Sequence, residues 1–206
     1  MKRMKRTAAF LLAALLVMSM AGCGKDFDAK GYVEAAMAAK YRGEYADYAK
    51  MTGMSEEEAK EDMESEFDEF MKDDLESIGL DTTDEQIEQY QQVQRDLRAK
   101  IEYEVKDAVK DDDDNYTVDV VVTPLDAYDK TEAGIQDEWM EAVENGADED
   151  DLIQIFIDFY KECVDNAQPK DPVTITLHVE KQEEGKQTVY GIPESEQMEL
   201  ENAMVY

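Results

Sequence analysis

The chain has 206 residues, and its 52 acidic residues against 21 Lys and Arg give a formal charge of −31 at pH 7. A surface of this sign repels nucleic acids and anionic lipid headgroups, which excludes both as electrostatically favoured partners. Hydrophobic residues still make up 43% of the chain and recur at regular spacing, which excludes an acidic disordered tail. The acidity leaves two interpretations, a solvating surface or a surface that attracts Ca²⁺ or a cationic partner.

The first 22 residues have the composition of an export signal. Four basic residues precede an almost wholly apolar run that ends at Met20: Lys2, Arg3, Lys5 and Arg6. That run is shorter than the roughly 20 residues of a membrane span, and its flanks are those of a secretory signal. The segment from Ser19 to Cys23 resembles a bacterial lipobox, so we expect cleavage before Cys23 and a diacylglycerol on it. Cleavage by an ordinary signal peptidase, which leaves Cys23 as a free thiol, is the alternative.

This leader sets the expected organisation of the chain. We expect a signal peptide over 1–22, a lipidated cysteine with a short tether over 23–27, and a single extracytoplasmic α+β domain over 28–206, held at the cell membrane. If Cys23 is acylated, Cys163 has no partner for a disulfide. The apolar helical surroundings of Cys163 predict a buried thiol.

Three helices are predicted in the first half of the domain. Asp28 is a suitable N-cap for a helix from residue 29, which Gly43 interrupts and Gly53 ends. A second helix begins at the capping box of Ser55 and Glu58 and ends at Gly79. Its apolar stripe runs through Ala59, Met63, Phe67, Phe70, Met71, Leu75 and Ile78, and its other faces are mostly Glu and Asp. A third helix begins at Thr83, with Gln86 at the capping-box position.

The second half alternates between strand and helix patterns. Residues 101–105 and 116–122 alternate apolar and polar side chains, and the acidic run 111–115 predicts a hairpin connection between them, with an irregularity near residue 108. Helical spacing then covers 135–143, through Ile135, Trp139, Met140 and Val143, and a more apolar helix covers 152–164. Alternation returns over 173–180 and 188–192, which predicts a C-terminal hairpin. The tail from 194 to 206 has room for one short helix.

The order of these elements predicts the fold class. N-terminal helices, an antiparallel hairpin, two further helices and a C-terminal hairpin follow one another with no βαβ repeat. This order is typical of an α+β domain in which helices pack on one face of an antiparallel sheet.

The lipobox, the run from Tyr41 to Gly53 (YRGEYADYAKMTG) and the capped acidic helix after it together resemble a group of small uncharacterised lipoproteins of Gram-positive bacteria. The resemblance covers most of the mature chain. It implies a cystatin-like or nuclear-transport-factor-2-like α+β domain, in which a curved sheet cups a long helix. The family brings no established activity and no site residues to this chain.

The chain offers no combination of residues typical of an enzyme. A Ser-His-Asp triad needs His178, whose strand neighbours Thr176 and Glu180 place it on a polar face. One histidine and two cysteines are too few for a zinc site, and no phosphate-binding glycine motif is present. We therefore expect no catalytic activity and no cofactor.

Two acidic runs are weak calcium candidates. Asp111 and Asp113 lie in the first, and Asp148 and Asp150 lie in the second. Both runs supply the oxygen ligands that Ca²⁺ prefers, but neither has the spacing or the central glycine of an EF-hand.

Aromatic residues supply a candidate ligand pocket. Tyr41, Tyr45 and Tyr48 cluster early in the chain, and Trp139 lies in a later helix. In a cupped domain they line a cavity or, as aromatics at helical spacing more often do, form the core.

The sequence therefore predicts a lipid-anchored, non-catalytic module that contacts a protein or a wall component through its acidic helical face. A small-ligand binding protein with an aromatic-lined cavity is the alternative. An electrostatic interface weakens steeply with salt and a buried aromatic pocket does not. The oligomeric state is left open.

Overall fold

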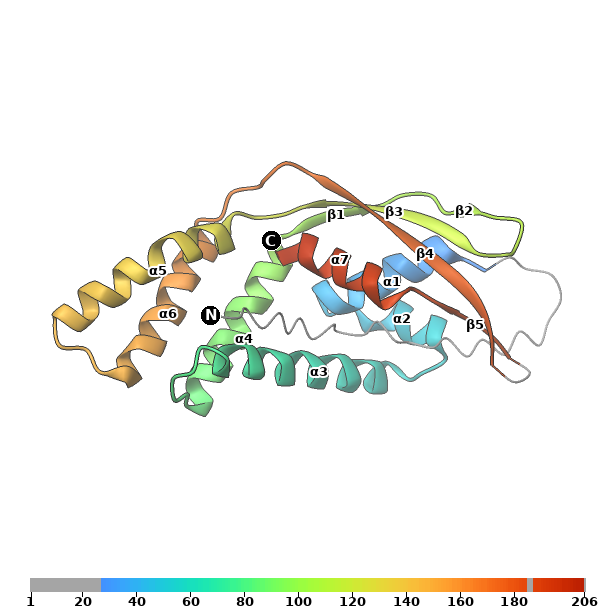
Figure 1. The fold of residues 1–206 in the computed structure, drawn as a ribbon. Helices are drawn as coiled ribbons and strands as arrows, with labels where there is room; N and C mark the ends of the chain where they lie inside the picture. The colour runs from blue at the N-terminus through green and yellow to red at the C-terminus, as the bar shows by residue number, and fades with distance from the viewer. Residues whose placement is uncertain (1–26, 185–186, 206) are drawn as a thin grey trace. The chain divides into compact units, whose positions relative to one another are not determined.

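The computed structural model describes residues 27–184 and 187–205, and within them the chain forms seven helices and five strands (Figure 1). The helices are α1 (Ala29–Arg42), α2 (Tyr45–Thr52), α3 (Glu56–Glu76), α4 (Asp84–Lys100), α5 (Ala127–Glu144), α6 (Glu149–Asp165) and α7 (Glu194–Val205). The strands are β1 (Glu102–Val105), β2 (Val109–Lys110), β3 (Tyr116–Thr123), β4 (Val173–Glu184) and β5 (Gln187–Gly191). Helices pack on one face of a curved antiparallel sheet, so the predicted α+β class is confirmed (Figure 1).

The chain forms two compact units, each built from segments that are distant in sequence. Unit 1 contains residues 27–65, 103–122 and 173–203, and unit 2 contains residues 66–102, 123–172 and 204–205. Unit 1 thus holds almost all of the sheet with α1, α2, the first half of α3 and most of α7. Unit 2 holds the second half of α3 with α4, α5 and α6.

The sheet of unit 1 has one apolar face. Its strand order is β1-β3-β4-β5, with β2 also paired to β3. β3 and β4 pair antiparallel over seven residues, with Val118 opposite Leu177. Along β3, every second side chain is buried: Tyr116, Val118, Val120 and Val122. Because side chains alternate across a strand, burial of every second residue places one continuous apolar surface against the helices.

An aromatic cluster fixes the first described residue to the sheet. Phe27 stacks on Tyr190 of β5, with ring centroids 4.0 Å apart and planes 2° apart. Its ring centroid lies 5.9 Å from those of Tyr116 and Tyr32, and its backbone N–H donates to the Tyr116 hydroxyl at 3.2 Å. Aromatic pairs at these separations gain stability beyond their buried area. The segment before α1 is therefore held on β3 and β5.

Local signals set the N-terminal helix boundaries as the sequence predicts. The Asp28 carboxylate accepts the backbone N–H of Gly31 at 2.9 Å and caps α1, which ends where Gly43 adopts a left-handed conformation (φ 68°). Ser55 and Glu58 form the predicted capping box before α3, and Gly79 is left-handed (φ 86°) after it. Each of these groups satisfies backbone donors or acceptors that a helix end leaves unpaired.

The predicted connection over the acidic run is a structured turn. Strands β1 and β2 are separated by residues 106–108, which is the irregularity expected near residue 108. The Asp111 carboxylate accepts the backbone N–H groups of Asp113 and Asn115, each at 2.8 Å. Asp114 takes a left-handed conformation and pairs with Lys110 and Lys181. These contacts close the turn.

The sequence predicted a C-terminal helix without giving its boundaries. In the structure, this helix, α7, lies beside β4 at the point where β5 has ended. β5 ends opposite Glu180, so the backbone of His178 has no β5 partner. The Glu196 carboxylate of α7 accepts the His178 backbone N–H at 2.6 Å and lies 2.7 Å from its Nδ1. Pro193 begins the turn into α7 and lacks the N–H that a continued strand needs. A side chain therefore replaces the missing strand partner.

Unit 2 is built around two helix pairs, α5 with α6 and α4 with α6. Gly134 of α5 allows the Phe159 ring of α6 to approach the helix closely, because a Cβ added at residue 134 would lie only 2.6 Å from Phe159 Cζ. The Trp139 indole N–H donates to the carbonyl of Leu152 at 2.9 Å. On α6 the buried side chains are Ile153, Ile157, Tyr160, Cys163 and Val164, which confirms burial of the Cys163 thiol.

The prediction for the α5 stripe was partly wrong. Met140 and Val143 were assigned to its apolar face, yet they are 58% and 55% exposed. Gly134 and Trp139 contact α6, and Met140 and Val143 are left on the exposed part of the α5 surface. Helical spacing identified an amphipathic helix, but tertiary packing decided which apolar side chains face inward.

Candidate functional site

The acidic face of α3 is the most highly charged helical surface in the described chain. The 21 residues of α3 include 12 Glu or Asp and two Lys. Its apolar side chains turn inward, with Ala59, Phe67, Met71 and Leu75 buried. The outer face carries exposed carboxylates: Glu61, Asp62, Glu69 and Asp73. Like charges at this spacing oppose the helix, so packing of the inner stripe must stabilise it.

Part of this charge is neutralised on the side of α3 that faces α4. Arg95 of α4 pairs with Asp68, and its guanidinium lies 4.6 Å from the centre of the Phe67 ring. The guanidinium of buried Arg98 lies 4.7 Å from the same ring. Cations over an aromatic face gain electrostatic energy. Both arginines serve the contact between α3 and α4, whereas the outer carboxylates face solvent.

A partly buried polar contact also joins the two helices. The Tyr90 hydroxyl donates to the Asp74 carboxylate at 2.5 Å and accepts from the Gln94 amide at 2.7 Å. Desolvation raises the pKa of Asp74, and the hydrogen bond from Tyr90 opposes that rise. Burial raises the pKa of Tyr90 well above its usual range. This pair has shifted pKa values because it is partly removed from water, and no substrate-sized space is needed to explain them.

The predicted tyrosine cluster lies in unit 1 and is tied into its packing. Tyr41 and Tyr48 are buried, and Tyr45 is half-buried. The Tyr41 hydroxyl donates to the Glu201 carboxylate at 2.7 Å, and the Tyr45 hydroxyl donates to Glu64 at 3.4 Å. Lys40 also pairs with Glu201, at 2.5 Å. Tyr41 and Tyr45 therefore join α1 and α2 to neighbouring helices, and Tyr48 is part of the buried interior.

Trp139, the fourth predicted pocket residue, lies in unit 2. Its ring centroid is 6.4 Å from that of Phe156, which in turn stacks on Tyr160 at 6.0 Å. Tyr90 completes this cluster, 6.0 Å from both Phe156 and Tyr160. The structure thus places three of the four predicted residues in unit 1 and the fourth in unit 2.

The two acidic runs predicted as calcium candidates lie in different parts of the fold, one in the β2–β3 turn and the other at the start of α6. The Asp111 carboxylate closes the β2–β3 turn, and Asp113 lies in the same turn. Asp148 is the N-cap of α6, where its side chain accepts the Asp151 N–H at 3.2 Å and Asp151 reciprocates. Asp150 lies in the first turn of α6. Within the described residues, no group of three or more Asp, Glu, His or Cys has the arrangement to hold a metal ion.

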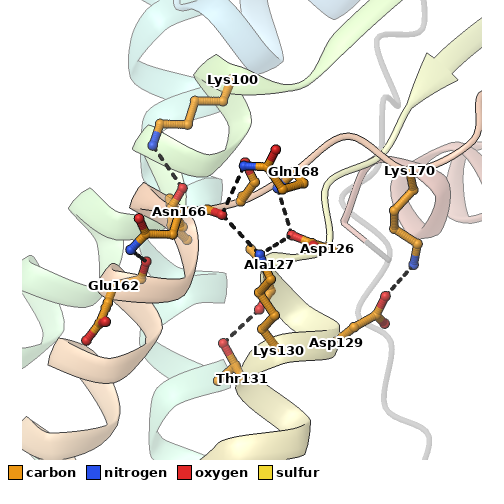
Figure 2. Close-up of polar contacts among 12 residues, drawn as sticks. Lys100, Asp126, Ala127, Asp129, Lys130, Thr131, Glu162, Asn166, Gln168 and Lys170 are labelled. Carbon is orange, nitrogen blue, oxygen red and sulfur yellow. Dashed lines mark hydrogen bonds and ion pairs between the residues drawn. The ribbon is translucent and has the colours of Figure 1, made fainter.

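The sequence did not predict a group of polar contacts at the C-terminal end of α6 (Figure 2). We call this group, which joins residues 124–130 and Lys100 to residues 164–170, the clasp. Residues 124–126 run antiparallel to 168–170, with Leu125 opposite Pro169. The Asp126 N–H donates to the Gln168 carbonyl at 3.0 Å, and the Gln168 N–H donates to the Asp126 carboxylate at 2.7 Å. The hydrogen bond from the Gln168 N–H is the largest cause of a lowered pKa of Asp126.

Three lysines complete the clasp, from α4, from α5 and from the segment before β4 (Figure 2). Lys100 donates to the Val164 carbonyl at 2.9 Å and Lys130 to the Asn166 carbonyl at 3.0 Å. Lys170 pairs with Asp129 at 2.7 Å. The last turn of α6 has no basic residue of its own, so Lys100 and Lys130 supply the positive charge that a helix C-terminus favours. No sequence periodicity signals these contacts, because they join residues 30 or more positions apart.

His178 confirms its predicted exposure, since its side chain is 53% exposed. Its neighbour on β4, Thr176, donates to Asp119 of β3 at 2.7 Å. The imidazole therefore lies on the polar face of the sheet, with Glu196 as its partner.

Two findings bear on the membrane predictions. Among the described residues, no helix is both long and apolar enough to cross a bilayer. The signal peptide, Cys23 and most of the tether lie outside the described residues, so the predicted lipidation stays a prediction.

The fold and these surfaces define an α+β domain with an acidic helical face and two aromatic clusters. Residues 29–193 match a family described as a domain of unknown function (DUF5105), and the chain belongs to that family. The chain matches none of the curated proteins. It is similar in fold to the crystal structure of a candidate lipoprotein (ycdA) from Bacillus subtilis subsp. subtilis str. 168, with a TM-score of 0.60 and 16% identity. The match covers 87% of this chain and 56% of that one, so the chain spans just over half of that protein.

Proposed function

We propose that this protein is a lipid-anchored, extracytoplasmic module that binds another protein or a wall component and catalyses no reaction. The observation that carries the binding role is the outer face of α3, where exposed carboxylates follow one another along a well-packed helix. Carboxylates that face solvent on a rigid element steer a cationic partner and set its orientation. The cystatin-like or nuclear-transport-factor-2-like form of the domain is part of the same proposal.

Three observations support the anchored location. The leader combines a basic start, a short apolar run and a cysteine at the lipobox position. The solved structure with a similar fold is that of a candidate lipoprotein. Phe27 is held on β3 and β5, four residues after Cys23, and four extended residues span about 13 Å. A domain on so short a tether stays close to the bilayer.

The anchor is tested by metabolic labelling with a fatty acid and by fractionation of the cells. Wild-type protein should carry the label and sediment with membranes, whereas Cys23→Ser should carry none and leave the membrane fraction. Cys163→Ser is the matched control and should keep the label. A Cys23→Ser protein that stays labelled would show that another group holds the anchor.

The binding role is tested with a photo-crosslinking residue placed at Glu69 on α3, in cells that make the anchored protein. A discrete adduct should form there and disappear at about 1 M salt, where the Debye length is only about 3 Å. The same probe at Glu88 on exposed α4 surface is the control. The triple variant Asp62→Asn/Glu69→Gln/Asp73→Asn should bind less isolated wall material or partner than Asp112→Asn/Glu88→Gln/Glu180→Gln, which has the same net charge. Equal binding by both variants would contradict a specific role for α3.

Thermal unfolding against a metabolite panel separates this proposal from the small-ligand alternative. A ligand at about 100 times its Kd adds roughly 2.7 kcal/mol to stability. An α3 interface predicts no saturable shift with any one metabolite. A saturable, salt-insensitive shift that is lost in Tyr45→Ala would instead favour a cavity beside the tyrosine cluster.

A further inference from the structure

One helical face in unit 2 exposes neighbouring large apolar side chains. Met140 and Val143 of α5 are 58% and 55% exposed, and they lie three residues apart, on the same side of the helix. Single exposed apolar residues are ordinary on protein surfaces, but adjacent ones on one face mark an interaction site more often. Among the described residues, the other exposed large apolar side chains lie singly: Val109 on β2, Val173 on β4, and Tyr128 near the start of α5, twelve residues before Met140.

The orientation of this face is fixed by the packing of α5 on α6. Trp139 donates its indole N–H to the Leu152 carbonyl, and Gly134 lies against the Phe159 ring. Thr131 is buried on the same inward side and donates to the Ala127 carbonyl at 2.9 Å. At 100° per residue, Met140 lies on the side of α5 opposite Thr131. Contacts on the other side of α5 therefore hold Met140 outward, and Val143 lies between Trp139 and Met140 around the helix.

Carboxylates border the exposed pair. Asp137 precedes Met140 by three residues and Glu144 follows it by four, so both flank the methionine on the helix surface. Both side chains are exposed, as is Gln136 beside them. The nearest cation on α5 is Lys130, which is held by Asp126 and the Asn166 carbonyl in the clasp.

This charge pattern selects among possible occupants. A second copy of the chain brings the same carboxylates to the same place, and each copy has a formal charge of −31. An anionic bilayer is repelled for the same reason. A helix with apolar residues on one face and Lys or Arg beside them complements both the Met140–Val143 pair and its carboxylate border.

We propose that the outer face of α5 binds a basic amphipathic helical segment of a partner protein. The apolar side chains of that segment cover Met140 and Val143, and its cations pair with Asp137 and Glu144. Methionine suits such a surface because its flexible side chain adapts to differently shaped partners. The proposal rests on the role of this protein as a binding module, but it uses a surface different from the α3 face.

The test uses the full lipidated chain in nanodiscs of zwitterionic lipid and a synthetic Leu/Lys peptide of about 18 residues with helical amphipathic spacing. Trp139 is the only tryptophan of the chain and adjoins Met140, so its fluorescence reports binding at this face. A peptide of the same composition in scrambled order measures binding by charge alone, and empty nanodiscs measure binding to lipid.

The expected result is that Met140→Ser/Val143→Ser lowers the affinity for the amphipathic peptide by about tenfold or more, since two apolar contacts are lost. The matched control Val109→Ser/Val173→Ser changes exposed apolar residues elsewhere and should leave the affinity within about twofold. Asp137→Asn/Glu144→Gln should reduce the salt dependence of binding.

Three outcomes would overturn the proposal: equal affinities for the two serine variants, equal affinities for the two peptides, or no binding of either peptide to wild-type protein. Sedimentation without peptide tests the second-copy alternative, which requires self-association that Met140→Ser/Val143→Ser abolishes. The α3 triple variant should bind the peptide through α5 as wild type does, apart from general charge effects. The two proposals can therefore fail separately.

Discussion

Unit 1 and unit 2 stabilise their interiors in different ways. The interior of unit 1 consists of alternating β3 and β4 side chains against α1, with Phe27 and Tyr190 stacked at 4.0 Å. Its main ionic contact, between Lys40 and Glu201, is shielded, with side chains 10% and 19% exposed. Unit 2 also buries apolar and aromatic side chains, among them Tyr90 and Tyr160. It adds polar contacts near the surface, where Lys100 and Lys130 donate to carbonyls at the end of α6 and the Asp126 carboxylate accepts the Gln168 N–H.

Because of this difference, we expect the stability of the two units to respond differently to salt and to pH. Buried apolar contacts and shielded ion pairs respond weakly to salt, whereas exposed charge contacts are screened at physiological ionic strength. We therefore expect unit 2 to lose stability with salt and acid sooner than unit 1. Trp139 lies in unit 2, so its fluorescence follows that unit, while far-UV circular dichroism follows the whole described fold. Four predictions sharpen or break this comparison.

The largest effect is expected from Phe27→Ala in unit 1. Phe27 is 6% exposed and contacts Tyr32, Tyr116 and Tyr190, so its removal leaves a cavity between α1 and the sheet. We expect a loss of about 3–5 kcal/mol in the free energy of unfolding. Urea unfolding followed by circular dichroism measures it. A loss below about 1 kcal/mol would show that Phe27 is not part of the core.

Glu201→Ala should have the next largest effect, because Lys40 and the Tyr41 hydroxyl lose their common partner. Breaking a shielded ion pair by removing one member costs about 3 kcal/mol. The double variant Lys40→Met/Glu201→Gln removes both charges and should recover much of that stability. Urea unfolding at low and high salt compares the variants, and a loss that disappears in salt would show that the pair is screened like a surface contact.

Lys100→Met in unit 2 should cost less, about 1 kcal/mol or below. The variant removes the hydrogen bond to the Val164 carbonyl and the 3.5 Å contact with Asp165. Cations at a helix C-terminus contribute typically 0.3–1 kcal/mol, and salt weakens them. The Trp139 transition should shift at low salt and little at high salt. Lys50→Met, an exposed lysine on α2, is the matched control and should not move this transition.

The smallest effect is expected from Asp126→Asn, and it should depend on pH. The pKa of Asp126 lies below its usual value because the Gln168 N–H and then Lys130 favour the carboxylate. A lowered pKa in the folded state stabilises the protein above the unfolded-state pKa, which is about 4 for Asp, and this stability is lost as pH falls through the folded-state pKa. Asp126→Asn should therefore be less stable than wild type at pH 7, and the difference should shrink below about pH 4.

Asp119→Asn supplies the control for that pH series, because it removes an exposed-face carboxylate from unit 1. Wild type and Asp126→Asn are compared through the Trp139 transition from pH 7 downward. A difference that stays constant over this range would mean that the hydrogen bonds, and not the charge of Asp126, hold the clasp.

Much of the fold follows from local patterns in the sequence. The capping groups Asp28, Ser55 and Thr83 each begin the helix that the sequence predicts, because a cap needs only neighbouring residues. The alternation over 116–122 and 173–179 predicts the buried face of β3 and β4, because successive side chains point to opposite sides of a strand. These signals act within a few residues, so the sequence displays them directly.

The candidate sites followed from the sequence only in part. The acidic face of α3 is visible as a run of carboxylates around a regular apolar stripe. The pocket hypothesis grouped Tyr41, Tyr45 and Tyr48 with Trp139, yet these residues belong to different units. The exposure of Met140 was missed, because periodicity identifies apolar positions but cannot tell which of them a neighbouring helix covers.

The sequence by itself determined the extreme negative charge, the class of fold and the ends of most helices, because each depends on composition or on residues close in the chain. Tertiary structure alone decided that Glu201 pairs with Lys40, that Lys100 and Lys130 cap α6, and that α5 turns Met140 and Val143 outward. These features join residues far apart in sequence. They depend on how all the elements of a unit pack together, and a local sequence pattern contains no information on that packing.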